Sequence, residues 1–337
     1  MAETKTKTSR RDFLTTMMLA PGVLALAGES AITFGARDQR IPVVTNYNAT
    51  GKSVLDEGHT LLLGLTFAGL VDANKARGSF PVMIEPESFG GQQLEEPQPL
   101  YFYPSADRKT LFTILTAPLD PAPGPGVPLQ FSITGKTEER LTWNYVIRTF
   151  PYRNTVLTLD KEFSEPAPET SAQIKRDFSE MVEVLKARSE RKWTQPFMLP
   201  VTGGDNDNFG VKRTVNKTKR YRHRGLDMHA RMGTPVKAIN DGRVGLSTEQ
   251  WVAGQTIVVD HGGGVFSKYA HLSARQVSKG DQVLRGQVIA LSGNSGGQKA
   301  PAHLHLDTIV NGSHCDPKDF MRTAQKLLNA EAGVKVR

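Results

Sequence analysis

Cysteine is almost absent from this sequence, since Cys315 is the single cysteine among 337 residues. One thiol excludes an internal disulfide, a zinc site built from several cysteines and a Cys-x-x-Cys redox motif. Long apolar runs are also lacking, because no segment after the start of the chain is long and apolar enough to span a membrane. Disulfides and membrane-spanning helices are therefore not expected to hold this fold together.

Acidic residues are outnumbered by basic ones, with 34 Asp and Glu against 42 Lys and Arg and a formal net charge of +8. Hydrophobic residues make up 38% of the chain, which is enough to form real cores and excludes a disordered chain. The length favours two domains of ordinary size or one large domain. The positive charge favours a polyanionic partner, such as nucleic acid, a membrane surface or an acidic wall polymer.

The start of the chain has the pattern of an export signal. Arg10 and Arg11 precede an apolar run that ends at Ala27 in a small-x-small pattern. Such a run is too short for a stable membrane span and is typical of a cleavable signal peptide, although a basic start followed by a buried helix is the alternative. Residues 9–14 resemble a twin-arginine (Tat) motif. We therefore expect residues 1–27 to direct Tat export to the periplasm, the cell envelope or the exterior.

Residues 38–160 have the pattern of a domain of short strands. Apolar and polar residues alternate in two stretches, and a Pro- and Gly-rich segment at 118–128 predicts a loop before them. We expect an immunoglobulin-like antiparallel β-sandwich without a cluster of catalytic residue types. The alternating apolar positions are Leu129, Phe131 and Ile133 in the first stretch and Leu141, Trp143, Tyr145 and Ile147 in the second.

A linker helix is predicted within residues 165–192. Pro166 to Pro168 interrupt the strand pattern, and apolar residues then recur at helical spacing with charged residues between them. We expect the apolar side of this helix to pack on a domain. The recurring positions are Ile174, Phe178, Met181, Val182 and Leu185.

The C-terminal part, residues 193–325, is expected to form a compact antiparallel β domain. Glycines are frequent and the predicted strands are short, with one at 282–284. The segment Asn240-Asp241-Gly242 is typical of a hairpin turn. A short helix is predicted at about 320–331. The predicted fold class is therefore mainly β.

Seven of the eight histidines lie in this C-terminal part, and they include two closely spaced groups. His223 and Asp227 form an H-x-x-x-D spacing, and His303 and His305 form an H-x-H spacing. Residues i and i+2 of a strand point to the same face, so His303 and His305 should project into one site. Two imidazoles and one carboxylate from these groups would supply the three ligands of a hydrolytic zinc site. Each pair alone arises often by chance.

A third motif, Tyr269-Ala270-His271-Leu272, lies between these two groups. Together with the other matching segments, its order and spacing resemble the lysostaphin/LytM-type zinc metallopeptidases, which cut peptide bonds in bacterial peptidoglycan. The N-terminal β-sandwich and helix also resemble the non-catalytic N-terminal domain of some of these proteins. The other matching segments are Phe209-Gly210, Gly233-Thr234-Pro235-Val236, Asp241-Gly242-x-Val244 and Gly280-Asp281-x-Val283.

The resemblance implies that Zn²⁺ is the cofactor and that His223, Asp227 and His305 are its ligands. It also implies that His271 and His303 are catalytic histidines that do not bind the metal. One of them can accept a proton from water, and the other can stabilise the oxyanion and protonate the leaving amine. The sequence does not apportion these roles.

Two further side chains have alternative interpretations. Tyr269 shares a strand face with His271, so it could support His271 by a hydrogen bond or could simply pack in the core. Cys315 is interpreted as an inert thiol rather than as a nucleophile.

A basic run precedes and includes the first metal-ligand motif. Because Tyr221 is the only aromatic residue within it, the run lacks the stacking platforms expected of a nucleic-acid site. Two interpretations stay open, a solvated loop and a cationic rim that attracts an anionic wall polymer. The run consists of Lys212, Arg213, Lys217, Lys219, Arg220, Arg222 and Arg224.

The sequence as a whole predicts a zinc-dependent endopeptidase whose partner is a peptidoglycan peptide, with no nucleic-acid partner and no membrane span after processing. Two alternatives are a non-catalytic LytM-like activator of another cell-wall hydrolase and a metallopeptidase that acts on a protein. Degenerate members of the family typically lack zinc ligands or catalytic histidines, whereas all five matched positions are present here. The bond that is cut, any inhibitory role of the N-terminal domain and the oligomeric state are left open.

Overall fold

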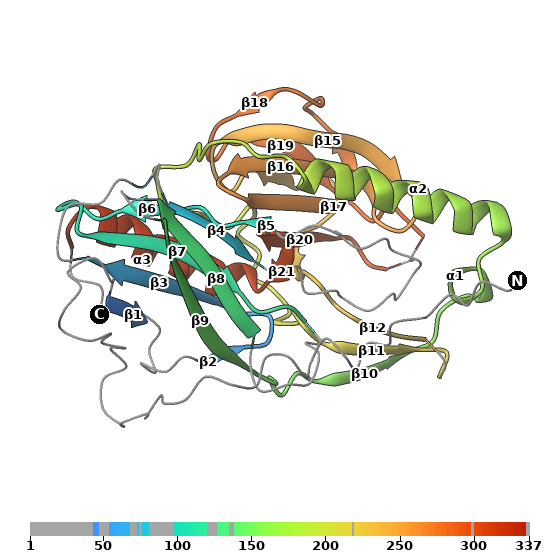
Figure 1. Cartoon of the computed structure of the whole chain (residues 1–337). Coiled ribbons are helices and arrows are strands. Elements are labelled where there is room, and N and C mark those ends of the chain that lie inside the picture. Colours follow the sequence, from blue (N-terminus) through green and yellow to red (C-terminus); the bar gives the residue numbers. More distant parts are fainter. Residues whose placement is uncertain are drawn as a thin grey trace, which may run out of the picture.

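The computed structural model describes residues 43–46, 54–67, 73, 76–80, 98–119, 127–134, 138–217, 219–297 and 300–334. The predicted export signal at residues 1–27 lies outside these described residues. Strands dominate the described chain (Figure 1), which confirms the mainly β fold class.

The N-terminal half contains two sheets, as a sandwich requires, and its immunoglobulin-like type stays a prediction. The alternating stretches form two antiparallel neighbours, with Leu129 opposite Trp143 and Phe131 opposite Leu141. One sheet has the order β1-β3-β7-β6, with β1 at Val43–Asn46, β3 at Thr60–Thr66, β7 at Thr110–Thr116 and β6 at Tyr103–Pro104. The other has the order β2-β9-β8-β4-β5, with β2 at Val54–Asp56, β9 at Glu138–Arg148, β8 at Val127–Thr134, β4 at Ala76–Phe80 and β5 at Gln98–Pro99.

The C-terminal part is built on a sheet with nine described strands, whose main path is β13-β20-β17-β16-β15-β18. Strand β19 pairs with β14 and β17, and β21 pairs with β20; all the pairs are antiparallel. The strands are β13 (Leu226–His229), β14 (Pro235–Lys237), β15 (Gly242–Gln250), β16 (Gly254–Gly262), β17 (Val265–Arg275), β18 (Gln282–Val283), β19 (Val288–Ser292), β20 (His303–Val310) and β21 (Ser313–Cys315).

The hairpin predicted at Asn240-Asp241-Gly242 is wrong. The strands on its two sides do not pair with each other, because β14 pairs with β19 and β15 pairs with β16 and β18. The side chain of Asn240 is fully buried, accepts a hydrogen bond from the Asp241 N–H and donates one to the carbonyl of Gln195. These contacts hold residues 240–242 as a connection between β14 and β15, which pair with other strands. The segment is therefore not a turn between two paired strands.

A helix lies within the predicted segment 165–192, namely α2 (Pro168–Leu185), preceded by the short helix α1 (Lys161–Ser164), and the role of α2 as a linker between domains stays a prediction. Pro168 is the first residue of α2, where its missing N–H leaves no intrahelical bond unmade. Met181 and Leu185 pack with Leu246 of β15 and its buried neighbours on β16 and β17. Figure 1 shows the C-terminal half of α2 lying on this part of the sheet, so this half of the helix is docked on the C-terminal part of the chain.

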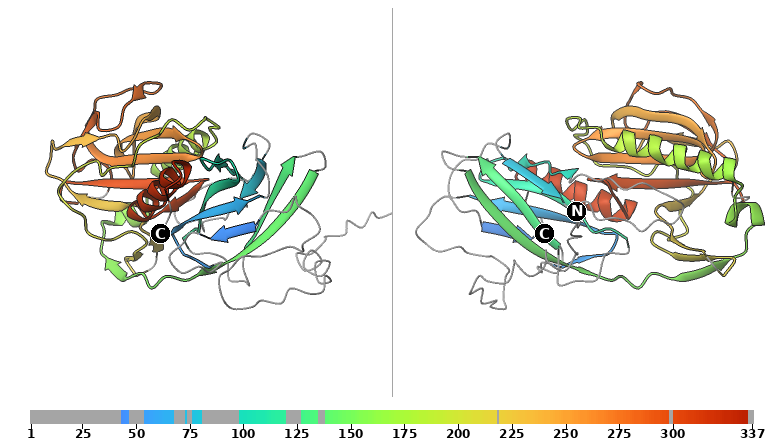
Figure 2. Two further views of the ribbon diagram at one scale, coloured as in Figure 1. Left: turned by 90° about the vertical axis from the view of Figure 1, so that its left-hand side faces the viewer. Right: turned by 45° about the vertical axis from the view of Figure 1, so that its right-hand side comes forward.

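The C-terminal helix α3 (Pro317–Glu331) joins the two halves of the molecule. It begins earlier than predicted, because the Asp316 carboxylate accepts hydrogen bonds from the first free N–H groups of the helix. Its Phe320 and Leu327 share one core with Leu62 of β3 and Phe112 of β7. The left view of Figure 2 shows α3 between the N-terminal sheets and the C-terminal sheet.

A small third sheet also links the halves. It has the order β10-β11-β12, with β10 (Asn154–Leu157) parallel to β11 (Lys212–Val215) and β11 antiparallel to β12 (Lys219–Arg222). Strand β12 leads directly to the first histidine motif. Among the helices in the described residues, none has the length and apolar character needed to cross a membrane.

Candidate metal centre

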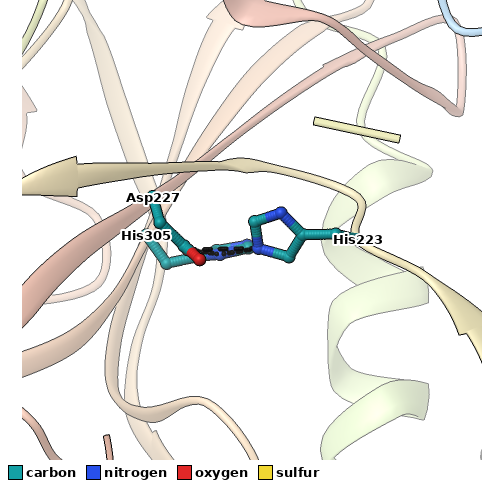
Figure 3. Close-up of side chains that lie close together, drawn as sticks. All are labelled: His223, Asp227 and His305. Carbon is teal, nitrogen blue, oxygen red and sulfur yellow. Dashed lines mark hydrogen bonds and ion pairs between the residues drawn. The ribbon is translucent and has the colours of Figure 1, made fainter. Parts of the chain in front are cut away.

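Two neighbouring strands and the turn before one of them bring His223, Asp227 and His305 together (Figure 3). Asp227 on β13 lies directly opposite His305 on β20, because these strands are antiparallel partners. His223 lies between β12 and β13, four residues before Asp227. The H-x-x-x-D and H-x-H groups, which are far apart in the sequence, therefore meet at one point.

The three side chains offer donor atoms at the spacing of a tetrahedral metal site. Nε2 of His223 lies 3.1 Å from Nδ1 of His305 and 3.1 Å from Oδ1 of Asp227, and the last two atoms are 2.9 Å apart. Zinc binds nitrogen and carboxylate oxygen at about 2.0–2.2 Å, so tetrahedral ligands lie about 3.3 Å from one another. A small movement of the three side chains away from one another would make room for the ion.

Hydrogen bonds on the outer side of each ring leave the inner nitrogens as lone-pair donors. Nδ1 of His223 lies 2.8 Å from the carbonyl of Asn208, and Nε2 of His305 lies 2.8 Å from Oδ1 of Asp307. Both oxygens accept, so each of these outer ring nitrogens carries a proton, and a neutral ring then has its lone pair on the inner nitrogen. Two imidazole lone pairs and one carboxylate oxygen then face one another, an arrangement that a cation stabilises.

The electrostatics of the site also favour a cation. Burial opposes a charge on His305, but the carboxylates of Asp307 and Asp227 outweigh it and raise the pKa of His305 to about 9. Without a metal, Nδ1 of His305 therefore also carries a proton at neutral pH, and a bound cation would take the place of that proton. Burial disfavours the charged form of Asp227 as well, yet its hydrogen bonds to His223 and His305 lower the pKa of this carboxyl below its usual range. Burial lowers the pKa of His223, which keeps this ring neutral.

The second carboxylate oxygen of Asp227 is held by residues that sequence reasoning missed. Nδ2 of Asn208 donates to Oδ2 of Asp227 at 2.8 Å, and the Arg213 guanidinium donates to the same oxygen at 3.2 Å. The N–H of Asp227 donates to Oδ1 of Asn208 at 3.0 Å. These contacts leave Oδ1 of Asp227 directed at the two rings.

The sequence positions of two of these residues, Asp307 and Asn208, do indicate their place near the centre. Asp307 follows His305 at the i+2 position, so strand alternation places it beside this histidine. Asn208 directly precedes the matched Phe209-Gly210 pair. Arg213 belongs to the basic run, where charge alone did not indicate a partner inside the site.

His271 and His303 lie beside the three-residue centre without joining it. Their ring centroids are 4.8 Å apart, and the His271 ring is 5.8 Å from that of His305. Nδ1 of His271 donates to the Ser295 carbonyl at 2.9 Å, and Nδ1 of His303 donates to the Pro301 carbonyl at 2.8 Å. Both rings therefore keep a lone pair on Nε2, and Nε2 of His303 lies 3.7 Å from Oδ1 of Asp227.

His271 has an unusual backbone. Its φ of 59° lies in the left-handed region, where a non-glycine residue is strained. Strain of this kind gathers at functional sites because the surrounding structure must hold it in place. Burial lowers the pKa of His271 to about 3, so the ring is neutral over the physiological pH range.

Residues 221–317, which include this centre, match the model of Peptidase family M23. These residues form an M23 peptidase domain. Peptidoglycan DD-endopeptidase ShyA of Vibrio cholerae is 42% identical over 108 residues, which are 32% of this chain and 25% of ShyA. Murein hydrolase activator EnvC of Escherichia coli is 41% identical over 100 residues, which are 30% of this chain and 24% of EnvC. The chain thus spans about a quarter of each of these relatives.

A solved structure extends the likeness beyond the M23 domain. A crystal structure described as a peptidase M23 from Pseudomonas aeruginosa superposes with a TM-score of 0.56 at 21% identity. The superposition covers 77% of this chain and 93% of that chain. At this identity the likeness concerns the fold alone, and its coverage includes more than residues 221–317.

In the described part of the chain, Tyr269 makes no hydrogen bond to His271, and this corrects one of the two interpretations of Tyr269. It is fully buried, and its hydroxyl accepts from the N–H of Ile239 at 2.9 Å and lies 3.0 Å from Oγ of Ser267. The left-handed turn at His271 breaks the alternation on which the prediction depended. Tyr269 therefore packs in the core.

Cys315 lies on β21, fully buried within the M23 domain. Burial raises the pKa of its thiol, which keeps the sulfur protonated. The position of this residue agrees with its interpretation as an inert thiol.

Proposed function

We propose that this protein is a zinc-dependent endopeptidase that hydrolyses peptide bonds in bacterial peptidoglycan. The observation that carries the proposal is the convergence of Nε2 of His223, Oδ1 of Asp227 and Nδ1 of His305, with the outer ring nitrogens already hydrogen-bonded. The name of the relative ShyA supplies the substrate class. In this proposal His223, Asp227 and His305 hold Zn²⁺.

The remaining histidines would carry the proton transfers. A zinc ion bound here would lower the pKa of a bound water to about 7 and polarise the scissile carbonyl. His271 and His303 each offer Nε2 beside the centre, because their Nδ1 atoms donate to carbonyl groups. One ring would accept the proton of the attacking water, and the other would donate to the oxyanion and then to the leaving amine.

We further propose that exposed cations near the centre attract the anionic wall polymer. Four residues of the basic run fall into two sets, since Arg213 binds Asp227 and Arg222 binds Glu57, whereas Lys217 and Arg220 are exposed on the β11–β12 hairpin. The first set belongs to the interior of the structure. The exposed residues of the second set, Lys217 and Arg220, are the ones that we propose as the cationic rim.

Export through the Tat pathway to the periplasm, cell envelope or exterior is part of the same proposal. It rests on the twin-arginine pattern and apolar run of residues 1–27. A protein that acts on peptidoglycan has to reach the wall, so the proposed export agrees with the proposed substrate.

A non-catalytic activator of another wall hydrolase is the second candidate, because the relative EnvC is named as an activator at nearly the same identity as ShyA. Incubation of the purified protein with peptidoglycan, with and without a chelator, followed by mass spectrometry of the products, separates the two. Metal-dependent peptide cleavage supports the enzyme. Bound zinc without product, or no bound zinc at all, would favour the activator.

A further inference from the structure

The loop that orients two of the proposed ligands, residues 205–210, is held on its outer side by the N-terminal half. Asn208 in this loop contacts both His223 and Asp227. The next two residues, Phe209 and Gly210, pack on Tyr152. The loop also precedes the M23 match, which starts at residue 221. Its supports are therefore not those of the peptidase domain alone.

Tyr152 and Glu57 form the surface on which this loop rests. The Tyr152 hydroxyl donates to the carbonyl of Glu57 at 2.7 Å, and its ring meets Phe209 edge-on with centroids 6.0 Å apart. Gly210 has a φ of 71°, and a Cβ there would lie 2.3 Å from the Tyr152 ring. Only glycine allows the loop to approach this ring so closely.

A buried ion pair fastens the same loop to the residue before the first proposed ligand. Arg222 is 8% exposed and Glu57 is fully buried, and the guanidinium contacts Oε1 of Glu57 at 2.5 Å. Arg222 also donates to the carbonyl of Gly210 at 3.0 Å, while the N–H of Gly210 donates to the carbonyl of His223 at 2.7 Å. A buried charge pair with these additional hydrogen bonds has one favourable geometry.

A third contact reaches the other end of the loop. The guanidinium of Arg153 donates to the carbonyls of Asn206 and Asp207 at 3.2 and 2.8 Å. The following strand, β10, pairs with β11, which carries Arg213 and its contact to Asp227. The segment 152–157 thus supports both residues that hold Oδ2 of Asp227.

From these contacts we propose that Glu57, Tyr152 and Arg153 are positioning residues of the metal centre and act through Asn208 on His223 and Asp227. The N-terminal half is then a structural part of the centre rather than a separate appendage. Its metal-binding consequence rests on the proposed function. The positioning itself concerns the protein without metal and can be tested separately.

The main test compares Glu57→Gln with the full-length wild type. The change keeps the shape of the side chain but removes the negative charge that faces the Arg222 guanidinium. Groups that directly orient metal ligands contribute about 10- to 100-fold to metal affinity. Glu57 does not contact a ligand and acts through Asn208, so its effect should lie at the lower end of this range. We expect zinc affinity to fall about tenfold in a chelator competition. Arg153→Ala, at an exposed side chain, should lower the affinity about threefold and serves if Glu57→Gln does not fold.

Asp56→Asn is the matched control. It removes the partner of Arg148 in a more exposed ion pair one residue away, where the side chains are 63% and 24% exposed. We expect it to leave zinc affinity unchanged. Asn208→Ala removes the side-chain contacts to Asp227 but keeps the Asn208 carbonyl on Nδ1 of His223. If Glu57 acts through Asn208, the effect of Glu57→Gln should therefore be smaller in that background than in the wild type.

Hydrogen exchange of the metal-free proteins gives a readout that does not depend on zinc. The amides of Gly210, His223 and Asp227 are bonded within the supported segment, and we expect them to exchange about tenfold faster in Glu57→Gln. Unchanged exchange in a folded variant, unchanged zinc affinity, or multiplying effects with Asn208→Ala would each overturn the inference. Failure of the wild type to bind zinc, with faster exchange in the variant, would instead refute the proposed function alone.

Discussion

Asp307 accepts a hydrogen bond from Nε2 of His305 at 2.8 Å, so Nδ1 of His305 faces Asp227 and His223. Removal of this acceptor should allow the ring to turn and to change its tautomer. We expect Asp307→Ala to weaken zinc binding about 10- to 100-fold, measured by competition with a chromogenic chelator. Asp307→Asn keeps an acceptor at the same place but loses the charge, and its effect should be smaller. Equal affinities in all three proteins would contradict the orienting role.

The two histidines of the H-x-H motif should separate metal binding from turnover. His305→Ala removes Nδ1 from the centre, so the purified protein should lose both zinc and peptidoglycan cleavage. His303→Ala leaves the three donor atoms in place, so zinc should be retained while turnover falls about 10²- to 10⁴-fold. Zinc stoichiometry by elemental analysis and product analysis by mass spectrometry check both outcomes. Loss of zinc in His303→Ala would instead make His303 a ligand.

The left-handed backbone of His271 permits a clean substitution. Asparagine tolerates this conformation better than most residues, so His271→Asn should keep the fold and the zinc content. It lacks the Nε2 lone pair, so we expect cleavage to fall about 10²- to 10⁴-fold. Thermal unfolding and zinc content are the controls. Activity near that of the wild type would show that His271 carries no proton in the reaction.

His261 should make stability depend on pH. Burial lowers its pKa from 6.5 to about 4, while its Nδ1 donates to the Asp241 carbonyl and Nε2 contacts Oγ of Ser267. The unfolded chain binds a proton at a higher pH than the folded chain, so this contribution to stability is complete above pH 6.5 and is lost as the pH falls towards 4. The loss amounts to about 3 kcal/mol.

The comparison that isolates this contribution uses His261→Asn, whose amide can still donate to the Asp241 carbonyl. Urea unfolding of the metal-free proteins at several pH values should give a steeper decline for the wild type between pH 6.5 and 4. Parallel curves for the two proteins would show that His261 does not titrate in this window.

The exposed part of the basic run should affect binding to the wall and not the metal centre. Charge reversal at Lys217 and Arg220 is expected to weaken binding to purified sacculi at low salt, and the difference should shrink as salt screens the charges. Lys175 and Arg176 on α2 are also exposed, so their reversal is a matched control with the same change in net charge. Equal binding of the two double variants would remove the rim from the proposal.

The sequence predicted those parts of the centre that depend on strand alternation. His303 and His305 project together because they are i and i+2 on β20, and the pairing of β13 with β20 then brings Asp227 to His305. Alternation does not hold where the backbone departs from a strand, as at His271, and the hydroxyl of Tyr269 therefore contacts Ile239 and not His271.

Long-range pairing accounts for the remaining differences. The turn chemistry of Asn240-Asp241-Gly242 is local, whereas the strand before it pairs with β19, about fifty residues later in the chain. Asn208 and Arg213 reach Asp227 because the N-terminal half supports their segments. Residue spacing within the C-terminal part carries no information about that support.

The shared core around α3 affects how the two halves of the molecule separate and unfold. Leu62 and Phe112 of the N-terminal half pack with Phe320 and Leu327, so separation of the halves would expose apolar area on both. Proteolysis within the linker should therefore leave two fragments that stay associated, and heating should unfold them in one cooperative transition. A peptidase domain expressed alone would present this uncovered face to solvent and aggregate.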